Sequence, residues 1–220
     1  MLLLYIIMSS IPWTEKYRPS KFSDIILSPY NKNLFVNILQ TNIFPNLLFH
    51  GPPGIGKTTT IINLINKYQQ LNNEENKQTV IHLNASDERG IDIIRNNIYN
   101  FINSDNLFYK GTKFIILDEV DYMTRTAQIA LKYLIQEYSS NVKYCLICNY
   151  VSKIENSLQN EFVKVRFNKL NNNHIFEYLN MIIKKESINV SNNIVHKIID
   201  YHNSDIRSMI NFLQANINEF

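Results

Sequence analysis

The sequence predicts an α/β fold in which a P-loop core, a parallel sheet flanked by helices, is followed by a small all-helical domain. Three observations lead to this prediction. Short apolar runs alternate with segments of helical spacing as far as residue 168, which is typical of a parallel sheet between helices. The first run leads into the glycine-rich stretch GPPGIGKT at 51–58. After residue 168 only helical patterns remain.

Five apolar runs are expected to form the strands of the sheet. Those at 113–117 and 143–148 are apolar almost throughout, as are strands that are covered on both faces. The expected strands lie at residues 46–50, 79–84, 112–119, 142–149 and 162–167. The helices expected between them lie at residues 58–71, 91–102 and 126–138.

The chain as a whole is expected to divide into three parts. These are an N-terminal extension over 1–10, the α/β core domain over 11–168 and the helical domain over 169–220. In the last part, Ser191 and Ser204 are expected as helix N-caps because a serine hydroxyl accepts a bond from the free N–H groups of a first turn. The helices expected there lie at residues 173–188, 191–202 and 204–217.

The apolar start, MLLLYIIM at 1–8, does not predict a membrane segment. A spanning helix needs about 20 apolar residues. No basic region and no small-residue cleavage site mark it as a signal peptide, and Met8 offers an alternative start. We therefore expect no membrane partner.

Charge and cysteine content restrict the function only weakly. Lys and Arg number 22 against 19 Asp and Glu, and the net charge of +3 neither requires nor excludes a nucleic-acid partner. Cys145 and Cys148 lie three residues apart in an apolar strand-like run, so their side chains should point to opposite faces. We interpret them as buried free thiols rather than a redox or zinc pair, which fits a reducing compartment.

The glycine-rich stretch matches the phosphate-binding pattern G-x-x-x-x-G-K-[ST], with a strand before it and a helix after it. In such a loop the backbone N–H groups converge on phosphate oxygens at the start of a helix. Lys57 is expected to reach the β- and γ-phosphates, and the Thr58 hydroxyl to bind Mg²⁺. The alternative is a chance glycine turn. The expected nucleotide-binding residues are Gly51, Pro52, Pro53, Gly54, Ile55, Gly56, Lys57, Thr58 and Thr59.

The run FIILDEVD at 114–121 supplies acids at the end of an expected strand. Asp118 lies where open α/β sheets bind ligands, and it is expected to hold Mg²⁺. Glu119 is expected to polarise an attacking water, which favours hydrolysis over phosphoryl transfer to another substrate. The alternative is that Glu119 is a surface acid at a strand end. Asp121 is a weaker candidate, interpreted as a loop or cap residue.

Several segments together resemble the small subunits of replication factor C, the clamp loader within the AAA+ ATPases. The resemblance runs from Ile11 to Gln214 and is greatest to the group called subunits 2, 4 and 5 in animals. A different AAA+ protein, such as a branch-migration ATPase, fits the combination less well. The segments are PWTEKYRPSKFSDII, PNLLFHGPPGIGKTTT, LNASDERGIDIIR, FIILDEVDYMT, AQIAL, YCLICNYVSKI and DIRSMINFLQ.

The resemblance implies further site residues beside the P-loop. Asn149 matches the sensor that orients water or contacts the γ-phosphate, although alone it reads as a strand-end turn residue. Arg207 matches the second sensor, in a helical lid, although alone it reads as a solvated helix arginine. The residues implied at the adenine end are Tyr17 and Arg18, with Thr14 close by, although without the resemblance this segment is interpreted as a structured N-terminal arm. With Glu119 and Lys57, the two sensors complete the expected catalytic set.

The resemblance also implies an activity and partners. It implies an ATPase that uses ATP and Mg²⁺, is weak alone and acts in a hetero-pentamer with other replication factor C subunits. Such assemblies load a sliding clamp onto primer–template double-stranded DNA without sequence preference, in the nucleus. Arg95, Arg125 and Lys132 are candidates for the DNA face, though each reads equally well as solvated surface.

Two departures from the family pattern leave the function open between two classes. The family has a C-terminal helical collar where this chain stops, so a fragment, a shortened product or a more weakly held subunit is expected. The family's Ser-Arg-Cys reads Asn160-Glu161-Phe162 here, and that arginine normally completes the neighbour's ATP site. The chain is therefore expected to be a hydrolysing subunit or, alternatively, a structural ATP-binding one.

Overall fold

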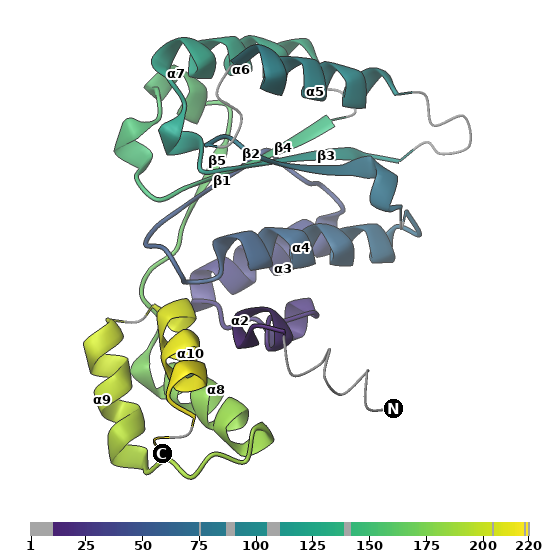
Figure 1. The fold of residues 1–220 in the computed structure, drawn as a ribbon. Helices are drawn as coiled ribbons and strands as arrows, with labels where there is room; N and C mark the ends of the chain where they lie inside the picture. Colours follow the sequence, from purple (N-terminus) through teal and green to yellow (C-terminus); the bar gives the residue numbers. More distant parts are fainter. Residues whose placement is uncertain are drawn as a thin grey trace.

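The sheet is parallel throughout and holds five strands in the order β2-β3-β4-β1-β5. The structure is a computed structural model that describes residues 11–74, 76–86, 91–104, 111–138, 142–203, 205–217 and 219 (Figure 1). All four neighbouring strand pairs run parallel, which confirms the predicted fold class. The strands are β1 (Leu47–His50), β2 (Val80–Asn84), β3 (Lys113–Asp118), β4 (Val142–Cys148) and β5 (Val163–Arg166).

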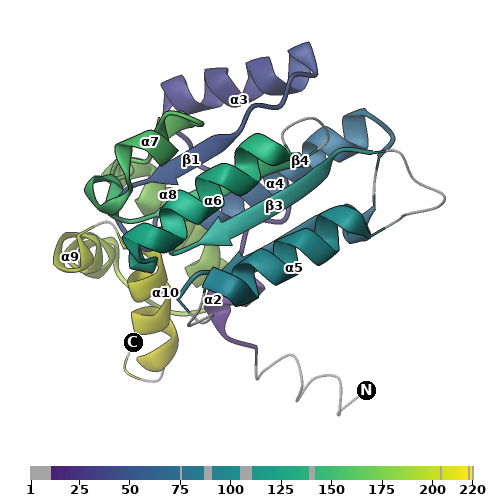
Figure 2. The ribbon, with the colours of Figure 1, turned by 90° about the horizontal axis from the view of Figure 1, so that it is seen from above.

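Helices cover both faces of the sheet, as Figures 1 and 2 show. On one face lie α3 (Pro29–Thr41) and α4 (Lys57–Leu71). On the other lie α5 (Ile91–Asn103), α6 (Arg125–Glu137) and the short α7 (Asn156–Gln159). Within the described residues, four single-turn 3₁₀ helices join the elements: η1 (Phe22–Asp24), η2 (Lys77–Thr79), η3 (Val120–Tyr122) and η4 (Val151–Lys153).

Helix α3 is the main element that sequence reasoning missed. Its start carries clear signals, because Ser28 caps it by accepting a bond from the Asn31 N–H and Pro29 occupies its first turn. It ends at Asn42 in the left-handed region, with φ of 56°. Within it, Phe35 and Ile38 are buried against the sheet side of the core. These capping signals were present in the sequence, but the segment does not lie between two predicted strands, so it was not recognised as part of the α/β pattern.

The two faces of the sheet carry separate apolar clusters, and the two cysteines are divided between them. Cys145 packs with the residues under α3 and α4, and Cys148 packs with those under α5 and α6. Both thiols are free and buried, as predicted. Burial raises the pKa of both, that of Cys148 to about 12, so neither is a reactive thiolate at neutral pH.

Three helices form the C-terminal domain: α8 (Asn172–Lys185), α9 (Asn192–His202) and α10 (Ile206–Ala215). Ser191 occupies the N-cap position of α9 without a capping bond from its side chain. Asp205 caps α10 through the Ser208 N–H. The other expected cap, Ser204, lies outside the described residues.

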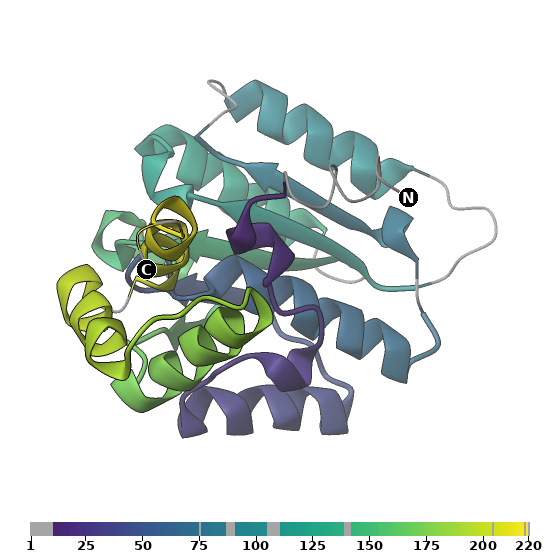
Figure 3. The ribbon, with the colours of Figure 1, turned by 60° about the horizontal axis from the view of Figure 1, so that its bottom comes forward.

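The core of this helical domain includes residues from the start of the chain. Trp13 and Tyr17 lie on or directly after the four-residue helix α2 (Trp13–Lys16), and both are buried among the apolar residues of α8, α9 and α10. Figure 3 shows this N-terminal segment beside the helical domain. Residues 13–19 form an N-terminal arm, which packs through Trp13 and Tyr17 with a domain that begins more than 150 residues later in the chain. None of the helices in the described part of the chain is long and apolar enough to cross a membrane.

Candidate nucleotide site

The glycine loop between β1 and α4 depends on its glycines for steric reasons. Gly51 and Gly54 have φ of 145° and 72°, where side chains are strained. A Cβ at Gly51 would lie 2.2 Å from the Phe167 carbonyl oxygen, and one at Gly54 would lie 1.9 Å from Asp205 Oδ1. The loop is therefore fitted closely against the end of β5 and against the cap of α10.

Lys57 begins α4, and its ammonium lies back over the loop. Its Nζ donates to the carbonyl oxygens of Gly51 at 2.8 Å and Pro52 at 2.7 Å. It also donates to Asn149 Oδ1 at 2.9 Å, which joins the P-loop to the end of β4. Burial lowers the Lys57 pKa, while the carboxylates of Asp118 and Asp121 oppose this shift. Three oxygens thus hold a buried cation at the edge of the loop.

Asp118 and Thr58 place two oxygen ligands side by side. The Thr58 hydroxyl donates to Asp118 Oδ2 at 2.7 Å, and the Glu119 N–H donates to Oδ1 at 2.9 Å. His82 Nε2 lies 3.7 Å from Oδ2. Burial alone would raise the Asp118 pKa, but the nearby His82 imidazole and the hydrogen bonds from Thr58 and the Glu119 backbone outweigh it, so the pKa lies below its usual value.

This pair fits a magnesium ion better than a transition metal. Mg²⁺ prefers oxygen ligands and keeps several waters and phosphate oxygens in its shell. Within the described residues, no group of three or more His, Cys, Asp or Glu side chains forms a metal cage. A hydroxyl and an ionised carboxylate beside a phosphate loop supply the protein's share of such a shell.

Glu119 leaves the sheet through a left-handed turn. Its φ is 56°, which is uncommon for a residue other than glycine, and η3 begins directly after it. This turn ends β3. Glu119 lines the same cavity as Asp118, Lys57 and Asn149. A carboxylate lies here at the carboxyl edge of a parallel sheet, where ligands of open α/β sheets bind.

Asp121 fixes the backbone that carries Asn149. Its carboxylate is buried, and Oδ2 accepts the N–H groups of Asn149 and Tyr150, both at 3.3 Å. Sequence reasoning interpreted Asp121 as a loop or cap residue and missed this link between η3 and the end of β4. The sequence signal was the apolar character of its neighbours Val120 and Met123, both of which are buried in the structure.

The site is a cavity of about 230 Å³ between the sheet edge and the helical domain. It brings together most of the predicted residues from five separate parts of the chain: Thr14, Arg18, Pro53, Gly54, Ile55, Gly56, Lys57, Thr58, Thr59, Asp118, Glu119, Asn149 and Arg207. Sequence reasoning did not single out other lining residues, of which Asp24, Ile25, Ile26, Leu170, Tyr178, Ile206 and Ile210 are examples. These lie in segments without a phosphate-binding motif.

Three predicted residues do not line the cavity. Gly51 and Pro52 instead offer their carbonyl oxygens to Lys57. Tyr17, expected at the adenine end, is buried in the core of the helical domain, and its hydroxyl donates to Glu186. Its neighbour Arg18 does line the cavity, where Nε donates to Thr59 Oγ1 at 3.0 Å.

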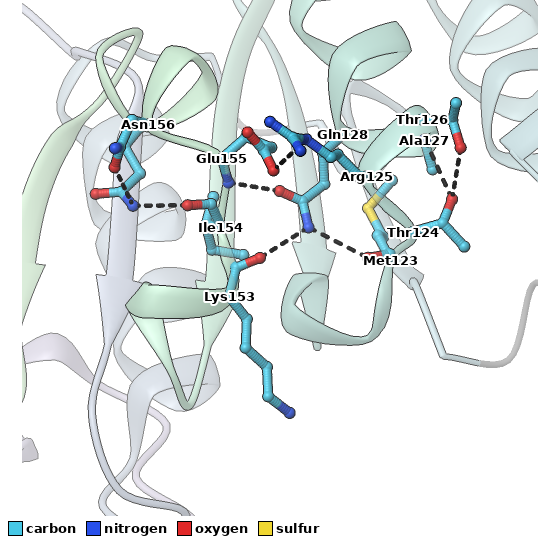
Figure 4. A network of polar contacts seen from close by, with 11 residues as sticks. Met123, Thr124, Arg125, Thr126, Ala127, Gln128, Lys153, Ile154, Glu155 and Asn156 are labelled. Carbon is cyan, nitrogen blue, oxygen red and sulfur yellow. Dashed lines mark hydrogen bonds and ion pairs between the residues drawn. The ribbon is translucent and has the colours of Figure 1, made fainter.

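A buried glutamine joins the two segments that follow Glu119 and Asn149 (Figure 4). Gln128 Nε2 donates to the carbonyl oxygens of Met123 at 3.2 Å and Lys153 at 3.1 Å. Its Oε1 accepts the Glu155 N–H at 2.7 Å. Beside it, Arg125 Nε lies 2.8 Å from Glu155 Oε1. The start of α6 is thereby connected to η4 and α7.

The residues expected on outer surfaces have mixed environments. Arg95 is exposed on α5 and Lys132 is half-buried on α6, whereas Arg125 is exposed but already paired with Glu155. Glu161, which replaces the family arginine, is half-buried and accepts a bond from Gln136 Nε2 at 2.7 Å.

A parallel sheet with a P-loop after β1, an acid pair at the end of β3 and a polar residue after β4 defines the P-loop nucleotide-binding class of α/β folds. The comparisons with known proteins narrow this class. The family model "ATPase family associated with various cellular activities (AAA)" matches residues 47–170, and the chain belongs to this family.

Two curated relatives confirm the resemblance to replication factor C small subunits. Replication factor C subunit 5 of Mus musculus is 37% identical over 206 residues, covering 94% of this chain and 60% of that protein. Replication factor C subunit 3 of Schizosaccharomyces pombe is 37% identical over 207 residues, with the same coverage. The chain thus spans about 60% of the length of these curated relatives.

Among solved structures, a point variant of Thermotoga maritima RuvB has a TM-score of 0.71. The two chains are 14% identical, and the aligned region covers 92% of this chain and 65% of the RuvB chain. At this identity the likeness concerns the fold alone.

Proposed function

We propose that the chain binds and hydrolyses ATP as a subunit of a clamp loader of the replication factor C type. One observation carries this proposal: Lys57, Thr58, Asp118, Glu119 and Asn149 meet in one cavity at the carboxyl edge of the sheet. The names of the relatives supply the assembly, since both are replication factor C subunits.

Each residue has a role that follows from its chemistry. The Lys57 ammonium binds the β- and γ-phosphate oxygens in place of the carbonyl and amide oxygens that it contacts here. Thr58 and Asp118 hold Mg²⁺, which neutralises charge on the phosphates when bound. Glu119 accepts a proton from the attacking water, and Asn149 orients that water or the γ-phosphate. Arg207 reaches the phosphates from α10.

The arm and the helical domain close the other side of the cavity. Thr14 and Arg18 lie on the arm side, and Tyr178, Ile206 and Ile210 add apolar surface from the helical domain. We assign this side to the base and ribose of the nucleotide, because apolar and aromatic lining with few polar groups is usual where a base binds.

The partners and the compartment belong to the same proposal. The chain assembles with other replication factor C subunits in a hetero-pentamer, binds a sliding clamp and contacts primer–template DNA in the nucleus. Contacts to the DNA are expected to be with phosphates, so they should weaken with salt and show no sequence preference. Arg95 and Lys132 remain candidates for these contacts. Arg125 is a weaker candidate, because Glu155 already neutralises it.

A purely structural ATP-binding subunit is less favoured. The chain's own expected base, Glu119, lies in the cavity together with the sensor Asn149 and the expected metal ligands Thr58 and Asp118. Glu161, which stands where the family has an arginine, would affect the ATP site of a neighbouring subunit and not the site of this chain.

The test is single-turnover ATP hydrolysis in a complex reconstituted with the other loader subunits, whose own P-loop lysines are replaced by alanine. We expect the parent chain to hydrolyse ATP and Glu119→Gln to bind it but react about 10²-fold or more slowly. Co-purification of the chain with the other subunits tests the assembly. Equal rates for parent and Glu119→Gln, or failure to co-purify, would argue against the corresponding part of the proposal.

A further inference from the structure

The N-terminal arm is built into the helical domain by contacts from two of its helices. The Trp13 N–H donates to Gln214 Oε1 on α10 at 2.9 Å. The Tyr178 hydroxyl on α8 donates to the Tyr17 carbonyl oxygen at 2.6 Å. The Trp13 and Tyr17 rings meet edge to face, with centroids 6.3 Å apart, and both are buried. The arm therefore belongs to the packing unit of the helical domain.

Glu186, at the C-terminal end of α8, binds two residues of the arm. It follows the last residue of α8, and its side chain is 15% exposed. One oxygen, Oε1, accepts both the Lys16 ammonium at 2.5 Å and the Tyr17 hydroxyl. The Lys185 ammonium lies 5.7 Å from the centre of the Tyr17 ring. Glu186 thus fixes two successive arm residues, and it is not among the residues that line the cavity.

The next residues of the arm are attached to the P-loop helix instead. Arg18 Nε donates to Thr59 Oγ1, directly after the expected magnesium ligand Thr58. Asn63 Nδ2, one turn further along α4, donates to the Pro19 carbonyl oxygen at 3.0 Å. Over four residues the chain passes from the helical domain to the nucleotide loop. Arg18, which lies in the cavity, thus directly follows Tyr17, which is anchored outside it.

We infer that Glu186 is a positioning residue for the nucleotide site, which acts through Lys16 and Tyr17 to place Arg18 at the cavity wall. The inference rests on the proposed nucleotide binding. It also gives Tyr17 a role that differs from contact with adenine: its ring fills the helical core and its hydroxyl sets the rotation of the arm. Without the carboxylate, Tyr17 and Lys16 lose their common acceptor, so Arg18, which also pairs with Glu15 on the arm at 3.2 Å, is held less firmly against Thr59.

The first experiment measures affinity for a fluorescent ATP analogue with Mg²⁺ by direct titration of the chain. Glu186→Ala is expected to weaken binding about 3- to 10-fold, which lies in the lower part of the range that pairwise coupling energies in contact networks span. Glu186→Gln, which keeps an acceptor for the Tyr17 hydroxyl, should recover part of the loss. The matched control is Glu177→Ala, an exposed acid on the same helix, which should bind as the parent does.

The second experiment tests the route through Arg18 by a double-mutant cycle. In an Arg18→Ala background, Glu186→Ala should change the affinity by less than about twofold, because its effect passes through the missing arginine. A loss of general stability would instead weaken binding equally in both backgrounds. Tyr17→Phe, which removes only the hydroxyl, gives the same comparison if Glu186→Ala does not fold.

The outcomes separate this inference from the proposed function. If the parent chain binds no nucleotide, the proposed function fails and this inference with it. If the parent binds and Glu186→Ala and Tyr17→Phe bind equally well, or if the losses are the same with and without Arg18, the inference alone is overturned.

Discussion

The Lys57 ammonium and the Asn149 side-chain oxygen lie 2.9 Å apart and join the P-loop to the end of β4. The two residues are 92 positions apart in the sequence and meet because β1 and β4 are adjacent parallel strands. Asp121 holds the Asn149 backbone in turn. A cation, an amide and two strand ends thus form one connected arrangement around the expected phosphate position.

Lys57→Ala is expected to weaken Mg-ATP binding at least tenfold, about 1.4 kcal/mol, because the buried phosphates then lack a compensating cation. Isothermal titration or a fluorescent analogue measures this. Lys67→Ala is the control, since Lys67 is exposed on the same helix and should change nothing. Equal affinity of Lys57→Ala and the parent would contradict the assignment of the loop.

The isolated chain is expected to be a poor ATPase. In the family the site lies between subunits and takes an arginine from the neighbour, which is worth roughly 10³–10⁵-fold, or about 4–7 kcal/mol. Phosphate release should therefore rise steeply on assembly. Rapid turnover by the pure chain that disappears in Glu119→Gln would show that no neighbour is needed.

Glu161→Arg is expected to increase hydrolysis at the neighbouring subunit's site about tenfold or more, or roughly 1.4 kcal/mol. A carboxylate near a γ-phosphate repels the charge that an arginine would stabilise. The measurement is hydrolysis in a reconstituted assembly in which only the neighbour's site is active. Glu161→Gln removes the charge without adding an arginine and shows how much of the gain is relief of repulsion.

If the parent assembly already hydrolyses ATP at that site at full speed, and Glu161→Arg has no effect, then Glu161 does not face it. The Gln136–Glu161 bond would then be an ordinary surface contact.

Gln128→Ala is expected to destabilise the fold by about 2 kcal/mol or more. It removes the partner of three backbone groups, and each buried polar group left unpaired costs about 1–3 kcal/mol. The free energy of unfolding in urea measures this. Gln136→Ala, an exposed glutamine on the same helix, should stay within about 0.5 kcal/mol of the parent. Similar values for the two variants would mean that the buried network carries little stability.

The sequence alone predicted the elements that leave a local pattern. Alternation of apolar runs with helical segments predicted the five strands and most helices, with small shifts at their ends. The P-loop was predictable because glycine, lysine and threonine must stand at fixed spacings to form a phosphate cradle. Asp118 and Glu119 were predictable because they follow an apolar strand directly. The sensor residues Asn149 and Arg207 required the family resemblance, because one strand-end Asn or helix Arg has many other uses.

Only the tertiary structure decided which distant segments meet. The bond from Trp13 to Gln214 spans 201 positions and that from Tyr17 to Glu186 spans 169, and neither leaves a periodic trace in the sequence. The same holds for the buried Asp121 carboxylate beneath Asn149. Periodicity reports which face of a helix or strand is buried, but not which partner covers it. For this reason the position of Tyr17, in the helical core rather than in the cavity, depends on packing between the two ends of the chain.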